Sequence, residues 1–183
     1  AVIEMGANRP HDIADLVAIA EPTVALVTMV GPAHLEGLGS LQGVANAKGE
    51  IYSRLPVGGT AIINADEPFA AQWRALVREA RVLSFGLHTA ADVIATDIHC
   101  GEVGTPTRFV LRTAEASCDV VLPFDGEHNV RNALAAATAA LAVGMSLESI
   151  VSGLARATRA KGRLTLRHSR GGMRVIDDSY NAN

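Results

Sequence analysis

The chain has 183 residues, of which 49% are hydrophobic and 19% charged, enough for one large domain or for one domain and the start of another. A net charge of −3 gives no electrostatic basis for binding nucleic acid or an anionic membrane, and no apolar run has the length of a membrane span. The two cysteines, Cys100 and Cys118, are too few for a disulfide framework and match no metal-binding spacing. We therefore expect a protein of the reducing cytoplasm, with no nucleic-acid or membrane partner.

The first half of the chain alternates short apolar runs with helical patterns. The apolar runs fit buried strands at residues 1–6, 24–30, 60–64 and 81–86. Helical spacing follows each of the first three runs, with expected starts near Pro10, Ser40 and Asp66. This alternation predicts an α/β fold with a mostly parallel sheet flanked by helices and joined by right-handed crossovers.

The pattern changes after residue 90. Three β-rich stretches separated by turn residues predict a small antiparallel β meander attached to the sheet, at residues 93–99, 107–113 and 117–122. An alanine-rich helix is expected from residue 130 to about residue 143, and a second helix from Ser146. Two further short strands are expected at residues 164–167 and 173–177.

Candidate site residues follow the ends of the predicted strands. Glu4 ends the first one, and the apolar run 24–30 leads into a Gly/Pro-rich loop with His34. The next helix carries Lys48 and Glu50. Since ligands bind at the carboxyl ends of strands in open α/β sheets, a carboxylate and an imidazole there fit a Mg²⁺ or Mn²⁺ site beside a phosphate. From the residues alone, a capping role for Glu4 and a loop hydrogen bond for His34 stay open.

Local sequence motifs for other chemistries are absent. The 183 residues contain no G-x-x-x-x-G-K-[ST] phosphate loop, no G-x-G-x-x-G after a strand and no G-x-S-x-G nucleophile elbow. Only two of the sixteen basic residues, Lys48 and Lys161, are lysines. Because the other basic residues are arginines, a lysine suggests a position where arginine could not perform the same role.

Seven motifs occur in a fixed order along the whole chain, and together they closely resemble those of the Mur ligases of peptidoglycan synthesis. They are E-M-G-A-N at 4–8, A-H-L-E-G-L-G-S at 33–40, A-K-G-E-I at 47–51, N-A-D at 64–66, H-N-V-R-N-A at 128–133, G-R-L at 162–164 and D-D-S-Y-N-A-N at 177–183. Within the family, the first two and the last are most similar to those of the ligases that add D-alanyl-D-alanine. Met29 departs from the family pattern, which has asparagine just before the loop.

The resemblance implies that these 183 residues are a part of a larger enzyme. Family members have a domain for the UDP-sugar substrate, a central ATPase domain and a C-terminal domain. Residues 1–170 resemble the central ATP-binding domain after its P-loop, and residues 171–183 the start of the C-terminal domain. We expect a monomer, and we expect these 183 residues alone to be inactive without the P-loop.

The activity implied by the resemblance is ATP-dependent amide formation. ATP would phosphorylate the C-terminal carboxylate of UDP-N-acetylmuramoyl-tripeptide, and the amine of D-alanyl-D-alanine would attack the acyl phosphate. Such phosphoryl transfer depends on positioning and on charge neutralisation by Mg²⁺. The alternatives are a sister ligase that adds a single amino acid and a non-catalytic nucleotide-binding module; the presence of the metal-site residues favours an enzyme.

The resemblance also implies the metal-site roles. Glu4 and His34 match metal ligands, and Lys48 matches the lysine that the family carbamylates. A carbamate can ligate or orient Mg²⁺, whereas an ammonium would repel it. Only a neutral amine reacts with CO₂, and the pKa of a lysine shifts readily on burial, whereas arginine stays charged. The alternative is a Lys48 cation that touches phosphate.

Four further residues match nucleotide contacts of the family. Asn129 and Asn132 lie three positions apart, on one helix face, and match residues at the adenine end of ATP. Arg163 matches an arginine at the ATP phosphates, and Asp178 an aspartate at the ribose. Helix capping by Asn129 and surface ion pairs for the other two stay open, and the segment 64–66 is either a turn or a contact. The remaining histidines are interpreted as surface or structural: His11, His88, His99 and His168.

Overall fold

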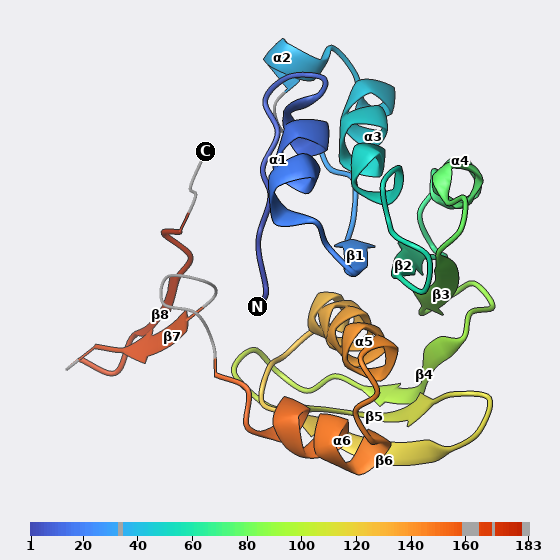
Figure 1. Cartoon of the computed structure of the whole chain (residues 1–183). Coiled ribbons are helices and arrows are strands. Elements are labelled where there is room, and N and C mark those ends of the chain that lie inside the picture. Colours follow the sequence, from blue (N-terminus) through green and yellow to red (C-terminus); the bar gives the residue numbers. More distant parts are fainter. Residues whose placement is uncertain (33–34, 159–164, 170, 181–183) are drawn as a thin grey trace.

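The structure is a computed structural model that describes residues 1–32, 35–158, 165–169 and 171–180. Its helices (Figure 1) are α1 Asp12–Ala20, α2 Leu35–Leu38, α3 Leu41–Gly49, α4 Ala70–Leu76, α5 Glu127–Ala142 and α6 Leu147–Ala155, with a 3-10 turn, η1, at Glu50–Tyr52. Its strands are β1 Val24–Val27, β2 Thr60–Asn64, β3 Arg81–Gly86, β4 Val93–His99, β5 Thr107–Arg112, β6 Ser117–Leu122, β7 Thr165–His168 and β8 Arg174–Asp177. Among the helices of these ranges, none combines the length and hydropathy needed to cross a membrane.

Six strands form one mixed sheet in the order β1-β2-β3-β4-β5-β6. The first four run parallel, and β4, β5 and β6 pair antiparallel. The meander is therefore a continuation of the parallel sheet, and the predicted α/β class is confirmed. β7 and β8 form a separate antiparallel hairpin.

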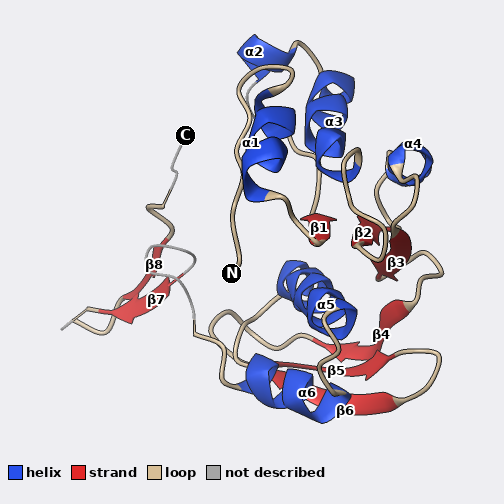
Figure 2. Ribbon diagram, viewed as in Figure 1, coloured by secondary structure: helices blue, strands red, loops and turns tan. Residues whose placement is uncertain are grey.

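Strand β2, between β1 and β3, is buried on both faces and separates two cores. Ile62 belongs to the core around α5, whereas Ala61 and Ile63 face the core built with α3 and α4. Figure 2 shows α1, α3 and α4 on one side of β1–β3 and α5 on the other. A strand that is buried on both faces needs an apolar residue at every interior position, which explains the run Ala61-Ile62-Ile63.

Helix α5 lies inside the curl of the sheet, between β1–β3 and the meander (Figure 2). The small side chains of Ala133, Ala135 and Ala137 are buried there, which lets the backbone approach the strands closely. The helix begins at Glu127, ahead of the predicted start at residue 130, after Gly126 turns the chain with a φ of 87°.

Three details of the N-terminal prediction are wrong. Residues 1–6 form no strand, because no strand in the described ranges pairs with them, and Val2 and Ile3 are exposed. Helix α1 begins at Asp12, so Pro10 precedes its first turn. β1 ends at Val27 instead of residue 30, and its side chains alternate between buried and half-buried. An apolar pattern alone does not reveal whether a hydrogen-bonding neighbour is present.

Helix α3 packs against α4. The helix starts near Ser40 as predicted, and Ser40 caps it, its hydroxyl accepting the N–H of Gly43 at 3.1 Å. The indole of Trp73, on α4, donates to the carbonyl of Ala45 at 3.0 Å. A Cβ at Gly49 would lie 2.8 Å from that indole ring, so only glycine permits this contact without a shift. Trp73 thus holds the second half of the helix that carries Lys48.

Tyr52 joins the end of this helical region to the sheet. Its buried hydroxyl accepts the N–H of Val27 at 3.0 Å and donates to the carbonyl of Ile62 at 2.7 Å. Burial raises the pKa of Tyr52 far above its usual value, although the Val27 N–H acts in the opposite direction, so the hydroxyl stays a donor. One side chain therefore bridges β1 and β2.

Tyr52→Phe should lower the free energy of unfolding by about 1–3 kcal/mol, because it leaves the buried N–H of Val27 and C=O of Ile62 without this partner. Urea unfolding followed by circular dichroism measures the change. The control is Val57→Ala at a 77% exposed position, where a loss within about 0.5 kcal/mol is expected. An unchanged urea midpoint for Tyr52→Phe would show that the bridge contributes nothing.

Candidate active site at the carboxyl edge of the sheet

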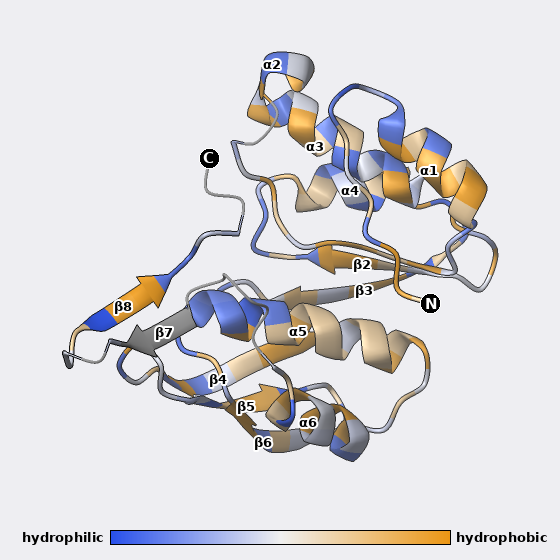
Figure 3. Cartoon of the chain, turned by 90° about the vertical axis from the view of Figure 1, so that its left-hand side faces the viewer, coloured by the Kyte–Doolittle hydropathy of each residue, from blue (hydrophilic) through white to orange (hydrophobic). Residues whose placement is uncertain are grey.

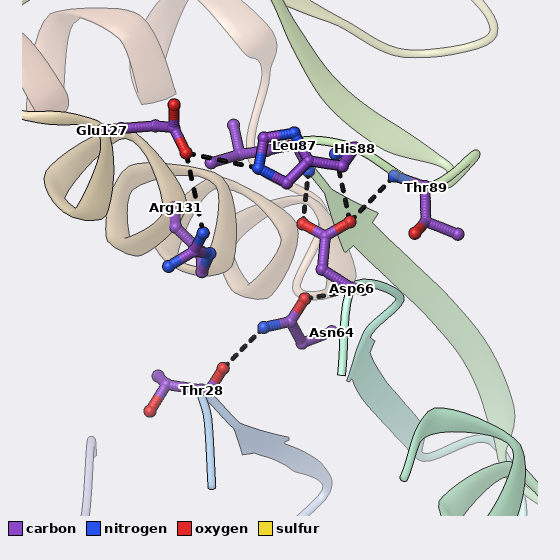
Figure 4. A network of polar contacts seen from close by, with 8 residues as sticks. All are labelled: Thr28, Asn64, Asp66, Leu87, His88, Thr89, Glu127 and Arg131. Carbon is purple, nitrogen blue, oxygen red and sulfur yellow. Dashed lines mark hydrogen bonds and ion pairs between the residues drawn. The ribbon is translucent and has the colours of Figure 1, made fainter. Parts of the chain in front are cut away.

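Two side chains at the end of β2, Asn64 and Asp66, connect the ends of neighbouring strands (Figure 4). Asn64 is buried, and its amide nitrogen donates to the carbonyl of Thr28, beyond β1, at 2.8 Å. Its amide oxygen accepts the N–H of Asp66 at 3.1 Å, which closes a turn. Of the two roles left open for residues 64–66, the structure supports the turn.

Asp66 fixes the loop that follows β3. Its carboxylate accepts the backbone N–H groups of Leu87, His88 and Thr89 at 2.7, 3.0 and 2.8 Å. Partial burial alone would raise the pKa of Asp66, but these three donors and the Thr89 hydroxyl hold it below its usual value. The carboxylate is therefore charged at neutral pH and links the ends of β2 and β3.

The same edge is joined to the start of α5. His88 Nε2 lies 3.3 Å from Glu127 Oε1, and Arg131 Nη2 lies 3.8 Å from the same oxygen. These groups are partly exposed, so the pairs orient side chains more than they stabilise the fold. In Figure 3 the hydrophilic first turns of α5 and the carboxyl ends of β2 and β3 face the same side. A helix N-terminus at this edge suits an anionic ligand.

Glu67 connects this edge with the helix that carries Lys48. Partial burial raises the pKa of Glu67, and the negative charge of Asp66 adds to the rise. The N–H of Val30 and the positive charges of Arg131 and Lys48 act in the opposite direction. The end of β1, the start of α5 and helix α3 thus converge on one carboxylate, and Lys48 is half-buried there.

The segment that carries Glu4 runs past α1 towards α2 (Figure 1), and Glu4 itself is exposed. At its end, the carbonyl of Asn8 packs against Gly37, where an added Cβ would lie only 1.9 Å from that oxygen. The E-M-G-A-N and A-H-L-E-G motifs therefore touch each other. His34 itself lies outside the described residues.

No group of three or more His, Cys, Asp or Glu side chains able to hold a metal ion occurs within the ranges that the structure describes. His34, a member of the predicted set, falls in a gap between these ranges, so the set Glu4, His34 and Lys48 stays a prediction. Carboxylate oxygen from Glu4 is the ligand type that Mg²⁺ prefers.

The predicted nucleotide residues are partly placed. Asn129 lies in the first turn of α5, where its amide nitrogen donates to the carbonyl of Asp125 at 2.8 Å and lies 3.0 Å from His128 Nε2. Asn132 is exposed on the next turn. Asp178 is exposed just after β8, in the hairpin outside the six-stranded sheet, and Arg163 lies outside the described residues.

Several residues of this edge are not among those predicted from the sequence. Glu67, Glu127 and Arg131 were not singled out, and His88 was assigned to the surface or to a structural role. Two signals were present: Glu67 follows a buried strand closely, and Arg131 lies inside the H-N-V-R-N-A motif. Glu127 and His88 have no such signal, because their contact joins segments far apart in the sequence.

The chain matches the family described as Mur ligase middle domain over residues 1–140. It is 46% identical, over its whole length, to UDP-N-acetylmuramoyl-tripeptide--D-alanyl-D-alanine ligase of Escherichia coli (strain K12) and spans 40% of that relative. The fold matches a crystal structure of MurF from Acinetobacter baumannii with a TM-score of 0.93 and 42% identity, covering 100% of this chain and 39% of that one. It also matches MurF ligase from Thermotoga maritima in complex with ADP, with a TM-score of 0.79 and 28% identity, covering 98% of this chain and 40% of that one.

Asp66→Asn should reduce stability in a pH-dependent way. Because the pKa of Asp66 is depressed in the folded state, the carboxylate adds stability above its unfolded pKa of about 3.9, and this is lost as the pH falls through the folded pKa. At pH 7 we expect the free energy of unfolding to fall by an amount on the order of 1 kcal/mol, allowing for the partial exposure of Asp66. Below about pH 4 the difference in unfolding free energy between the variant and the parent sequence should become smaller.

Urea unfolding across this pH range measures the effect of Asp66→Asn. The exposed Asp119, on β6, provides the control, since Asp119→Asn should change stability little. A difference in unfolding free energy between Asp66→Asn and the parent sequence that stays constant with pH would show that the charge of Asp66 is not its source.

Proposed function

The chain belongs to the Mur ligase family, and from this we propose that it is the central part of an ATP-dependent ligase that joins D-alanyl-D-alanine to UDP-N-acetylmuramoyl-tripeptide. The observation that carries the proposal is the packing of Asn8 against Gly37, which joins the Glu4 and His34 motifs. Membership of the family supplies the reaction class, and the greater likeness to D-alanyl-D-alanine ligases supplies the acceptor. The chain spans about two fifths of those relatives, so the activity is proposed for the full-length protein.

We propose residues 1–170 as the central ATP-binding domain and residues 171–183 as the start of the C-terminal domain. The position of the β7–β8 hairpin outside the six-stranded sheet supports a separate unit near this boundary. β7, before this proposed boundary, pairs with β8, after it. The full-length protein is proposed to be a cytoplasmic monomer without a nucleic-acid or membrane partner.

Glu4, His34 and Lys48 are proposed to hold Mg²⁺, which supplies charge neutralisation at the phosphates when bound. Lys48 is proposed to be carbamylated there. A carbamate would place a second negative group within reach of Glu67, and a divalent cation would offset that repulsion. Lys48 is half-buried on α3, and a lysine, unlike an arginine, has a neutral form that can react with CO₂.

The nucleotide is proposed to lie along the carboxyl edge near the start of α5. Asn132, exposed on α5, is proposed to meet the adenine edge, and Asn129, in the preceding turn, to lie beside it. Arg163 is proposed for the phosphates and Asp178 for the ribose, as the family pattern implies. Asp66 binds the backbone of the loop after β3 and so fixes the loop beside the proposed nucleotide position.

The proposed reaction forms one amide bond for each ATP consumed. The C-terminal carboxylate oxygen of the tripeptide takes the γ-phosphoryl group and ADP leaves. The amine of D-alanyl-D-alanine then attacks the acyl carbon, loses a proton and displaces inorganic phosphate. The residues of this chain contribute positioning and charge, which account for most of the catalysis of phosphoryl transfer.

The full-length enzyme should release phosphate from ATP and Mg²⁺ only when UDP-N-acetylmuramoyl-tripeptide and D-alanyl-D-alanine are both present. A phosphate-release assay with each substrate omitted in turn measures this. The 183 residues alone serve as a control and should release none above background, because the two substrates are not brought together. Equal activity with a single amino acid would favour the sister ligase, and nucleotide binding without turnover would favour the non-catalytic module.

Lys48→Arg should abolish a carbamate signal and lower kcat by roughly 100-fold or more, since arginine stays charged and does not react with CO₂. Carbon-13 NMR of the enzyme in labelled bicarbonate detects the carbamate carbonyl. Lys161→Arg, at the only other lysine of this chain, is the matched control and should keep the signal. A signal that survives Lys48→Arg would overturn the assignment.

A further inference from the structure

Helix α1 takes its N-terminal cap from another helical segment. Its own N-cap residue, His11, has a φ of 74° and makes no side-chain capping bond. Instead, the carboxylate of Glu50 accepts the N–H of His11 at 3.0 Å through one oxygen and the N–H of Ala14 at 3.1 Å through the other. The first N–H groups of a helix need such partners, and a carboxylate is favoured at that end.

Glu50 lies two positions after Lys48, where α3 passes into η1. Its side chain is 19% exposed, and His11 Nδ1 lies 3.6 Å from the same carboxylate. Both oxygens bind the start of α1, so the contact fixes a distance and an orientation. The end of α3 and the start of α1 are therefore held as one unit.

The start of α1 is in turn bound to the segment that carries Glu4. Asp12 accepts the N–H groups of Asn8 and Arg9 at 2.9 and 3.0 Å. The carbonyl of Asn8 packs against Gly37 of α2. Two side chains, Glu50 and Asp12, thus connect the helix of Lys48 to the end of the Glu4 segment.

We propose that Glu50 is a positioning residue that sets the spacing between the segment of Glu4 and the helix of Lys48, and thereby the geometry of the metal site. The inference rests on the proposed function, which assigns these two residues to the metal. A helix cap alone needs only a local side chain, such as Ser146 on α6. The Glu50 cap joins residues 36 and 39 positions apart.

Mn²⁺ binding to the full-length enzyme in bicarbonate buffer, followed by electron paramagnetic resonance, tests the role without requiring turnover. Glu50→Ala should weaken Mn²⁺ binding at least tenfold, because the two elements lose their link. Glu50→Gln has one acceptor oxygen, keeps one of the two bonds and should give an intermediate loss.

Ser146→Ala is the matched control, because it removes the hydroxyl that accepts the N–H of Ser149 at the start of α6. It should lower the urea midpoint, as Glu50→Ala does, yet leave the Mn²⁺ affinity unchanged. If Glu50→Ala lowered only the urea midpoint, Glu50 would be a helix cap and the proposal would be overturned.

The outcome for the proposed function is read separately, from phosphate release by the parent enzyme. An enzyme that binds Mn²⁺ but does not ligate would contradict the proposed function, and the Glu50→Ala titration would still decide the positioning role. A parent enzyme that binds no Mn²⁺ would overturn the positioning role, because there would be no metal site to position.

Discussion

The Asp66 carboxylate, with three backbone N–H groups directed at it, is the contact on which the carboxyl edge depends. Parallel strands end in loops that have no ladder to hold them, so each strand end needs another source of hydrogen bonds. Asn64 serves the end of β1, and Asp66 serves the end of β3. Asn64 ends β2 and Asp66 follows it, and all five residues of β2 are buried, so these contacts anchor the edge to the core. His88, on the loop that Asp66 holds, then meets Glu127 at the start of α5.

Helix α3, which carries Lys48, is held by contacts on the face of the sheet that packs against α3 and α4. Tyr52 bridges β1 and β2 from η1, and the Trp73 indole binds the backbone of α3. The role proposed for Lys48 would require the helix to be held in this way, because a small displacement of a positioned group can be costly in rate. The placement of Lys48 near Glu67 thus follows from packing on one face and strand ends on the other.

Most of the sheet could be predicted from the sequence, but part of the N-terminus and most of the site could not. Residues 60–64 and 81–86 are mostly apolar and lie between turn signals, so strands could be predicted there without knowledge of their pairing partners. The run 1–6 has the same character but no strand pairs with it in the described ranges. The contact of Glu50 with the start of α1 joins residues with no shared periodicity, so no local pattern could reveal it. The roles of Asn129 and Lys48 came from resemblance to a family, because a lone asparagine or lysine carries little information.

The balance of charge at the edge explains why a cation belongs in the proposed chemistry. Asp66, Glu67 and Glu127 supply three carboxylates there, against the positive charges of Lys48 and Arg131. A nucleotide polyphosphate would add several negative charges to a chain whose net charge is already −3. Carbamylation of Lys48 would remove one of the two cations and add a negative group in its place. Each step makes the edge more repulsive to phosphate on its own and more attractive to a divalent ion, so the arrangement suits ATP only as its metal complex.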